Sequence, residues 1–308
     1  MRYRAFGVTV ESELVWPGCA PMPEAAGPVV RLHQVAKATL ADPDDSELVW
    51  ATEVDGQEVR LVRRHDDAHV IDYGAQARFV IGPERDEVVA AAADEASAAW
   101  QRFMLDTVLL VVSHLRGLDL LRGGAVDLGG SAVAILGGTG SGPSAIVPEL
   151  VALGHPFVAD GAIALERSWR QIVVHPGPPV MSVPSGTDLS RLGPASALAS
   201  IGDDVWISVP SHADRPLALG AVVVVRRNEG GPPSLERTPA TVVDLLGFSV
   251  GFEESRERDE RRFHLVADVA SNVPVFALDA PFETSPGGIA AMIEGAVLDG
   301  AGVARADP

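Results

Sequence analysis

The sequence predicts an α/β protein in which a small antiparallel β-rich domain at the N-terminus is followed by an α/β domain that contains a phosphate-binding loop (P-loop). Short β-like runs separated by turn residues fill the first part of the chain. Apolar residues then recur at helical spacing, and a buried strand, a glycine-rich loop and a helix-like stretch follow in that order. These observations predict four segments: a β-rich domain over residues 1–85, a bridging helix over 86–117, the P-loop domain over 118–300 and a flexible tail over 301–308.

The composition limits the classes of function. The 308 residues include 24 Lys and Arg against 42 Asp and Glu, which gives a formal net charge of −18. A surface that binds nucleic acid needs positive charge for the phosphates, so this balance argues against nucleic acid as the main partner. Cys19 is the single cysteine, which excludes an intramolecular disulfide and a multi-cysteine zinc site. Because we find neither a secretion signal nor an apolar run of roughly 18 residues, we expect a cytoplasmic protein without membrane contact.

The first 83 residues are expected to form an antiparallel sheet, because their apolar runs are short and end at turn residues. The expected strands are Arg4–Val10, Leu48–Glu53, Val59–Arg64, His69–Tyr73 and Ala77–Ile81. The acidic pair Asp66 and Asp67 lies between two of them and is typical of a hairpin turn, not of a metal site.

Beyond the sheet, the apolar period changes to that of an amphipathic helix. The residues at three- and four-residue spacing are Trp100, Phe103, Met104, Val108, Val111, Val112 and Leu115. Gly117 follows as a stop signal. The pattern predicts a helix from about Asp86 to Arg116 whose apolar stripe packs into the core.

The rest of the chain alternates strands and helices. The expected strands are Ser131–Leu136, Phe157–Asp160, Ala162–Leu165, Leu219–Arg227 and Val275–Leu278. The expected helices run from Thr238 and Pro239 to Leu246, from Glu253 to about Ala270, and onward from about Gly288. A proline-rich loop is expected from Pro176 to Pro184.

A glycine-rich loop directly follows the strand Ser131–Leu136 and precedes a helix-like stretch. Its residues are Gly137, Gly138, Thr139, Gly140, Ser141, Gly142, Pro143 and Ser144, with the spacing of a P-loop. Glycines allow successive backbone N–H groups to point at a phosphate, and a helix N-terminus adds partial positive charge. The hydroxyl of Ser144 would then lie where a magnesium ligand is needed.

Two prolines depart from this pattern. Pro143 occupies the position of the P-loop lysine, and so removes both an ammonium group and a backbone N–H. Lys37 is the only lysine in the chain. Pro148 should cost the following helix one backbone hydrogen bond to the Ser144 carbonyl, which predicts a short or kinked helix. We therefore expect a site that is no longer held to catalytic geometry.

Several segments together resemble the HPr kinase/phosphorylase family, and more closely its relatives found beside bacterial peptide-modification genes. The segments are the glycine-rich loop, Leu153–Asp160, Val174–Pro179, Asp214–Ala221 and the opening run Tyr3–Val10. The resemblance covers most of the chain. It implies an HPr-kinase-like P-loop domain that binds ATP and Mg²⁺ and moves a phosphoryl group to or from a serine hydroxyl of a protein.

The resemblance also assigns roles to individual residues. The loop residues match the phosphate-binding positions, Ser144 and Asp160 match the metal positions, and Asp160 also matches the acid that serves the attacking hydroxyl. The second acidic position of the family is Gly161 here, and Arg122 stands where the family tends to carry a histidine. Together with Pro143, three chemically important positions depart at once.

Two functions are compatible with these departures. The first is a pseudokinase with a degenerate P-loop, acting as a binding or scaffold partner in a peptide or protein modification pathway. The second is an active ATP-dependent protein or peptide serine kinase, with Arg122 in place of the missing lysine and Asp160 as the base. ATP and Mg²⁺ are the expected cofactors if the site is functional, and none is expected otherwise. The expected partner is a protein or peptide, and the sequence leaves a homo-oligomer open.

Overall fold

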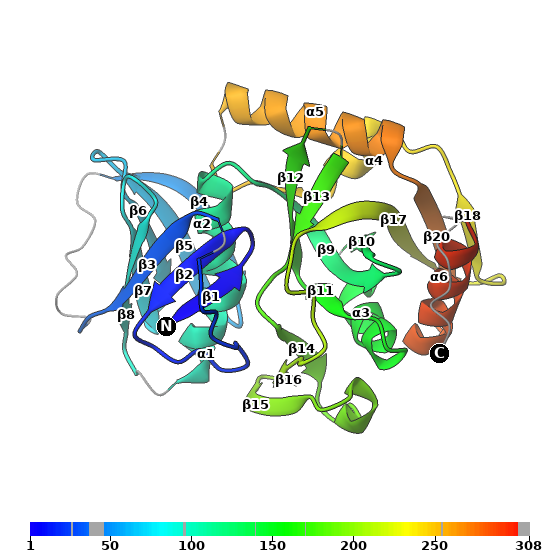
Figure 1. Ribbon diagram of the computed structural model, residues 1–308, viewed down its shortest axis with the longest axis horizontal. Helices are drawn as coiled ribbons and strands as arrows, with labels where there is room; N and C mark the ends of the chain where they lie inside the picture. Colours follow the sequence, from blue (N-terminus) through cyan, green and yellow to red (C-terminus); the bar gives the residue numbers. More distant parts are fainter. Residues whose placement is uncertain are drawn as a thin grey trace.

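An eight-stranded sheet forms the N-terminal part of the chain in the computed structural model, which describes residues 1–25, 27–36, 46–94, 97–138, 140–169, 171–253 and 255–300 (Figure 1). Its strands are β1 (Arg2–Ala5), β2 (Val8–Ser12), β3 (Val29–Gln34), β4 (Ser46–Val54), β5 (Gln57–Arg64), β6 (His69–Tyr73), β7 (Ala77–Ile81) and β8 (Glu87–Ala92), in the order β1-β2-β3-β8-β7-β6-β5-β4. The pairs β2–β3 and β3–β8 are parallel, and the other pairs are antiparallel. An antiparallel sheet was expected, and five of the seven neighbouring pairs are antiparallel; the two parallel pairs both involve β3, which was not expected, nor was β8.

The expected single strand Arg4–Val10 is wrong, because a two-residue turn divides it into β1 and β2. Phe6 and Gly7 both have positive φ angles, 48° and 80°. Turns of this kind join antiparallel strands tightly, and they match the natural twist of the strands. The hairpin turn expected at Asp66 and Asp67 is confirmed, since the Ala68 N–H donates to the Asp66 carboxylate at 3.2 Å.

The helix that follows the sheet begins later than predicted. Residues 87–92 form β8, which pairs with β7 and β3, and the helix begins at Ala98 after Ser97, whose hydroxyl accepts a hydrogen bond from the Ala99 N–H. It consists of α1 (Ala98–Phe103), a π-helical turn (Met104–Val108) and α2 (Leu109–Leu115). All seven residues of the predicted apolar stripe are buried in the core, as expected.

The C-terminal part contains a nine-stranded mixed sheet. Its strands are β9 (Asp119–Leu128), β10 (Ser131–Gly137), β11 (Phe157–Ala159), β12 (Ala162–Ser168), β13 (Gln171–His175), β17 (Leu217–Asn228), β18 (Ser234–Arg237), β19 (Ser249–Val250) and β20 (Val275–Pro281). Strands β10, β17 and β20 are parallel to one another, whereas β9 is antiparallel to β10 and also pairs with β11, β12 and β19. Five strands in the order β10-β9-β12-β13-β17 close on themselves through the β10–β17 pair.

Helices cover both faces of the parallel strands (Figure 1). Helices α3 (Pro143–Ala152) and α6 (Pro286–Gly300) pack on one face, in a core that includes Val133 and Ile135 of β10. Helix α5 (Arg256–Asn272) packs on the other face, in a core shared with α1, α2 and the N-terminal sheet. The two parts of the chain thus share one hydrophobic core. No helix within the described residues combines the length and the apolar character that a membrane span requires.

Three further predictions are corrected. Part of the expected loop Pro176–Pro184 is strand β14 (Val180–Pro184), which joins β15 (Ser196–Ile201) and β16 (Asp204–Ser208) in a small separate sheet. Helix α4 (Val242–Leu246) begins after Thr241, not at Thr238, because Thr241 and Asp244 exchange hydrogen bonds as a capping box. Helix α5 begins after Ser255, not at Glu253, for the same kind of reason: the Ser255 hydroxyl accepts from the Arg258 N–H. The expected tail over 301–308 lies outside the described residues.

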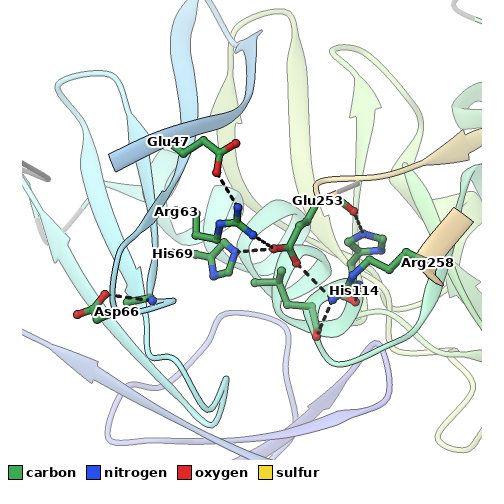
Figure 2. A network of polar contacts seen from close by, with 9 residues as sticks. Glu47, Arg63, Asp66, His69, His114, Glu253 and Arg258 are labelled. Atoms are coloured by element: carbon green, nitrogen blue, oxygen red, sulfur yellow. Dashed lines mark hydrogen bonds and ion pairs between the residues drawn. The ribbon is translucent and has the colours of Figure 1, made fainter. Parts of the chain in front are cut away.

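Glu253 connects the two parts of the chain (Figure 2). Its carboxylate accepts a hydrogen bond from Arg63 of β5 at 3.1 Å and lies 3.7 Å from Nε2 of His69, which is fully buried in β6. The same carboxylate lies 3.4 Å from Nη2 of Arg258 in α5. Arg258 also donates to the backbone carbonyl of His114 at 2.6 Å, at the end of α2, where the same carbonyl accepts a hydrogen bond from the Gly117 N–H. This network fixes α5 against both the sheet and α2.

Candidate functional site: a glycine-rich loop and its cavity

The glycine-rich loop lies between β10 and α3, so the predicted order of strand, loop and helix is present. Within the loop, Ser141 donates two hydrogen bonds to the Gly138 carbonyl, one from its N–H at 3.0 Å and one from its hydroxyl at 2.7 Å. Gly140 and Gly142 adopt positive φ angles of 81° and 94°, which the curled backbone requires. Thr139, also predicted to contact phosphate, lies outside the described residues.

Pro143 is the first residue of α3, and Gly142 is its N-cap. A proline is well tolerated at this position, because the first N–H groups of a helix have no partner within the helix. The carbonyl of Gly142 accepts hydrogen bonds from the N–H groups of Ala145 and Ile146. Pro143 therefore preserves the start of the helix but contributes neither an N–H nor an ammonium group to a bound anion.

Pro148 does not shorten the helix as expected. Helix α3 continues past it to Ala152, and Pro148 is itself buried within the helix. Ile146, Val147 and Leu150 on the same helix are completely buried against the sheet and α6. Burial of each such side chain stabilises a fold by roughly 1.5–3 kcal/mol, which offsets the penalty of about 3 kcal/mol for an internal proline.

Asp160 lies in the turn between β11 and β12, and it contacts the start of α3. Its carboxylate accepts hydrogen bonds from the N–H of Gly161 at 2.9 Å and from the hydroxyl of Ser144. Burial raises the pKa of Asp160 to about 6, while these two hydrogen bonds act in the opposite direction. The two residues predicted as metal ligands are therefore in direct contact.

Gly124 of β9 permits this close approach. A Cβ atom at Gly124 would lie 2.5 Å from Cγ2 of Val147 in α3 and 3.5 Å from a carboxylate oxygen of Asp160. Only a residue without a side chain leaves room there for α3 and the β11–β12 turn at once. The packing role of this glycine depends on the fold, which brings α3 and the β11–β12 turn to β9.

Arg122 is also on β9, where its N–H donates to the Phe248 carbonyl at 2.7 Å. Arg122 lines a cavity of about 430 Å³. The same cavity is lined by Asp160, Gly161 and six of the predicted loop residues, namely Gly137, Gly138, Gly140, Gly142, Pro143 and Ser144. Ser141 does not line it, because its hydroxyl turns back to the Gly138 carbonyl. The fold thus brings nearly all the described candidate residues to one cavity.

Three residues of this region were missed from the sequence. Asp204 and Ser182, on strands β16 and β14 of the small sheet, also line the cavity. Arg227, near the end of β17, connects the glycine-rich loop to the end of β20. Its Nε donates to the Ser141 carbonyl at 3.2 Å, and its Nη1 donates to the Pro281 carbonyl at 3.0 Å. Nothing local in the sequence marks these residues, since each reaches the loop only through strand pairing.

The charges around the cavity suit a metal better than a free triphosphate. Among the described residues that line it, Arg122 carries the one positive charge, against the carboxylates of Asp160 and Asp204. Mg²⁺ prefers hard oxygen ligands, and one or two carboxylates with phosphate oxygens are a usual set. Ser144, Asp160 and Asp204 supply such oxygens, and the loop supplies backbone N–H groups for phosphate. The residues therefore fit Mg²⁺ and a phosphate group, while the charge that a lysine would give to a triphosphate is missing.

Known proteins show little similarity to this chain. No protein-family model matches the chain, and no curated protein matches it. Among solved structures, the HPr(Ser) kinase/phosphatase from Coxiella burnetii is similar to it, with 15% sequence identity and a TM-score of 0.32 over 59% of this chain and 95% of that chain. A TM-score this low does not establish a shared topology, so the chemistry of the cavity follows from its own residues.

Proposed function

We propose that this chain is an HPr-kinase-like pseudokinase, which binds a phosphate-bearing ligand in the cavity of the glycine-rich loop without transferring the phosphoryl group. The observation that carries the proposal is the composition of the cavity. It keeps the glycines, Ser144 and Asp160, but it places Pro143 where a P-loop has its lysine. Binding elements are retained, and the main charge-neutralising element is lost.

Phosphoryl transfer requires the site to neutralise the negative charge of the phosphate. That reaction depends almost entirely on positioning the phosphate and neutralising its charge. Loss of one preorganised donor typically lowers a rate by about 10²–10³-fold. Backbone N–H groups at a helix N-terminus can still hold an anion without such a donor. The cavity thus supports binding of phosphate more strongly than it supports catalysis.

A binding or scaffold role in a peptide or protein modification pathway agrees with the sequence resemblance. In the family that the sequence resembles, the substrate hydroxyl belongs to a protein. A pseudokinase that retains the surface for such a partner could hold a peptide or a modifying enzyme while its own site remains inactive. This part of the proposal rests on the resemblance of the residues quoted above.

The second candidate function is an active serine kinase, and one observation favours it. Arg122 lines the same cavity as Ser144 and Asp160, and a guanidinium can bind phosphate in place of an ammonium group. Asp160, with its pKa raised to about 6 by burial, would accept a proton from an attacking hydroxyl near neutral pH. This candidate predicts transfer activity that depends on both residues.

The deciding experiment measures binding and transfer on the same preparations of the full chain. Calorimetry with MgATP should give weak binding to the parent, weaker binding to Arg122→Ala and tighter binding to Pro143→Lys. Release of phosphate from ATP, with and without a serine-containing peptide library, should stay at the level of buffer for the parent. Phosphoryl transfer that disappears in Asp160→Asn would establish the active kinase instead. Complete absence of nucleotide binding, with recovery in Pro143→Lys, would leave only the scaffold role.

A further inference from the structure

A second cavity, here called the junction cavity, lies where the N-terminal part of the chain meets the loops that flank the small sheet. Its volume is about 510 Å³, and it shares no lining residue with the cavity of the glycine-rich loop. It is lined by Tyr3 and Arg4 of β1, residues 19–23, the three residues Pro176, Gly177 and Pro179, and residues 212–215. Ligand sites often lie at such junctions, with volumes of about 300–1,000 Å³.

Tight contacts between the two parts of the chain hold the walls of the junction cavity. The Phe6 N–H donates to the Pro176 carbonyl at 2.7 Å. A Cβ atom at Gly18 would lie 2.8 Å from Cγ1 of Val180, so a glycine is needed where the N-terminal wall approaches β14. Proline rings, whose φ is fixed, line both walls. The cavity is therefore already formed in the free protein, and ligand binding orders few further groups.

The walls of the junction cavity are mainly apolar. Pro21, Met22 and Ala213 contribute to them, and so does Cys19. Burial raises the pKa of the Cys19 thiol to about 12, and the charge of Asp106 acts in the same direction. The thiol is therefore neutral at physiological pH and adds to the apolar surface. Such walls favour a ligand with an apolar body.

Two arginines beside these walls have no acidic partner among the described residues. Arg4 donates to the backbone carbonyl of Asp214, and Arg215 is exposed to solvent. No described carboxylate forms an ion pair with either guanidinium, although acidic residues outnumber Lys and Arg by 42 to 24 in the chain. A guanidinium binds a carboxylate or phosphate through parallel hydrogen bonds. Two such groups beside an apolar cavity indicate that the ligand carries an anionic group.

We propose that the junction cavity binds a small amphipathic anion, whose apolar body contacts the proline-lined walls and whose single acidic group binds Arg4 and Arg215. Because these arginines come from β1 and from the loop over residues 212–215, the bound ligand connects the two parts of the chain. This site is additional to the proposed function and does not depend on what the cavity of the glycine-rich loop binds.

The probes separate the apolar and the anionic contributions to binding. Anilinonaphthalene sulfonate (ANS) joins an aromatic body to one sulfonate and fluoresces in apolar surroundings, and phenyl-naphthylamine is the same body without the sulfonate. Fluorescence titration of the full-length chain should show ANS bound more tightly than phenyl-naphthylamine. Decanoate and decyl phosphate, which carry the same apolar chain, then compete with ANS and show which acidic group is preferred. Excess MgATP should leave ANS bound.

Two pairs of variants assign the binding to the junction cavity, with circular dichroism melting to verify folding. Ala20→Phe fills the cavity from an exposed position and should weaken binding of both probes by at least about tenfold, whereas Ala51→Phe, at an exposed position of β4, should not. Arg215→Gln should weaken ANS binding by about fivefold and leave phenyl-naphthylamine unaffected. Arg237→Gln, at an exposed position of β18, should behave as the parent.

The outcomes separate this inference from the proposed function. ANS binding that persists in MgATP and falls only in Ala20→Phe and Arg215→Gln supports the site, even if no nucleotide binds. Absence of ANS binding by the folded parent, its displacement by MgATP, or equal affinities of Ala20→Phe and Ala51→Phe overturn the site. Equal ANS affinities of Arg215→Gln and Arg237→Gln, or displacement by neither decanoate nor decyl phosphate, overturn the anionic class of the ligand. If Ala20→Phe does not fold, the arginine pair decides alone, because both of its positions are exposed.

Discussion

Acid should destabilise this protein through His114, which is buried at the end of α2 with 2% of its surface exposed. Burial, with the positive charge of Arg258 nearby, lowers the pKa of His114 from 6.5 to about 4, although one ring nitrogen lies 3.2 Å from the Leu118 carbonyl. The other ring nitrogen lies 3.5 Å from the Glu253 carbonyl (Figure 2). The ring is therefore neutral in the folded protein at pH 5, where the unfolded chain already binds a proton.

The sign and size of the effect follow from this difference. Between about pH 6.5 and pH 4 the unfolded state binds more protons, so the free energy of unfolding falls as the pH falls. Each unit of pKa difference is worth about 1.4 kcal/mol, so full protonation would cost about 3 kcal/mol. At about pH 4.5, where protonation of the folded state is incomplete, the expected loss is about 2.5 kcal/mol relative to neutral pH.

Urea unfolding at about pH 7.5 and pH 4.5 measures this loss. The variant His114→Gln retains a hydrogen-bond donor but does not titrate, so its stability should depend less on pH than that of the parent, by about 2.5 kcal/mol over this interval. His264→Gln, which changes an exposed histidine of α5, is the control and should retain the pH dependence of the parent. Equal losses of stability in His114→Gln and the parent would refute the reasoning.

Three other predictions concern the junction, the packing of α3 and the cavity. Glu253→Gln removes the negative charge that contacts both Arg63 of the N-terminal sheet and Arg258 of α5, and it should reduce the free energy of unfolding, measured in urea, by about 3 kcal/mol. As a control, Glu257→Gln at an exposed position of α5 should reduce it by less than about 0.5 kcal/mol. Gly124→Ala places a Cβ atom 2.5 Å from a side chain of α3 and should cost about 1–3 kcal/mol, while Gly230→Ala, with open space around it, should be neutral; equal melting temperatures for the two would contradict the packing argument. Because the pKa of Asp160 is about 6, its carboxylate gains a proton below that pH, so Mn²⁺ affinity should fall from about pH 7.5 to pH 5, and a flat profile would exclude this carboxylate as a ligand.

Local patterns in the sequence were sufficient to predict the helices and strands that their own residues determine. The apolar run before the glycines gave a strand, the glycines gave a loop, and the residues after Pro143 gave a helix. The hairpin strands β5, β6 and β7 were predicted for the same reason, since each ends at a turn that its own residues favour.

Errors arose where a distant partner decided the conformation. Residues 87–92 are rich in alanine and suit a helix, but pairing with β7 and β3 makes them a strand. Strand β14 was expected to be a proline-rich loop, and it is a strand only because β16 pairs with it. The penalty for Pro148 was estimated for an isolated helix, whereas burial of the neighbouring side chains keeps α3 intact.

The same contrast between local residues and distant strand partners applies to the candidate site. The sequence by itself determined which residue types the loop presents, including the absence of a lysine at Pro143, because these are properties of one continuous segment. Only the tertiary structure decided that Arg122, Asp160 and Asp204 line the same cavity as that loop. Arg122 and Asp204 lie on different strands and Asp160 lies in the turn between β11 and β12, so their convergence depends on the register and order of strands far apart in the chain, which no local period encodes.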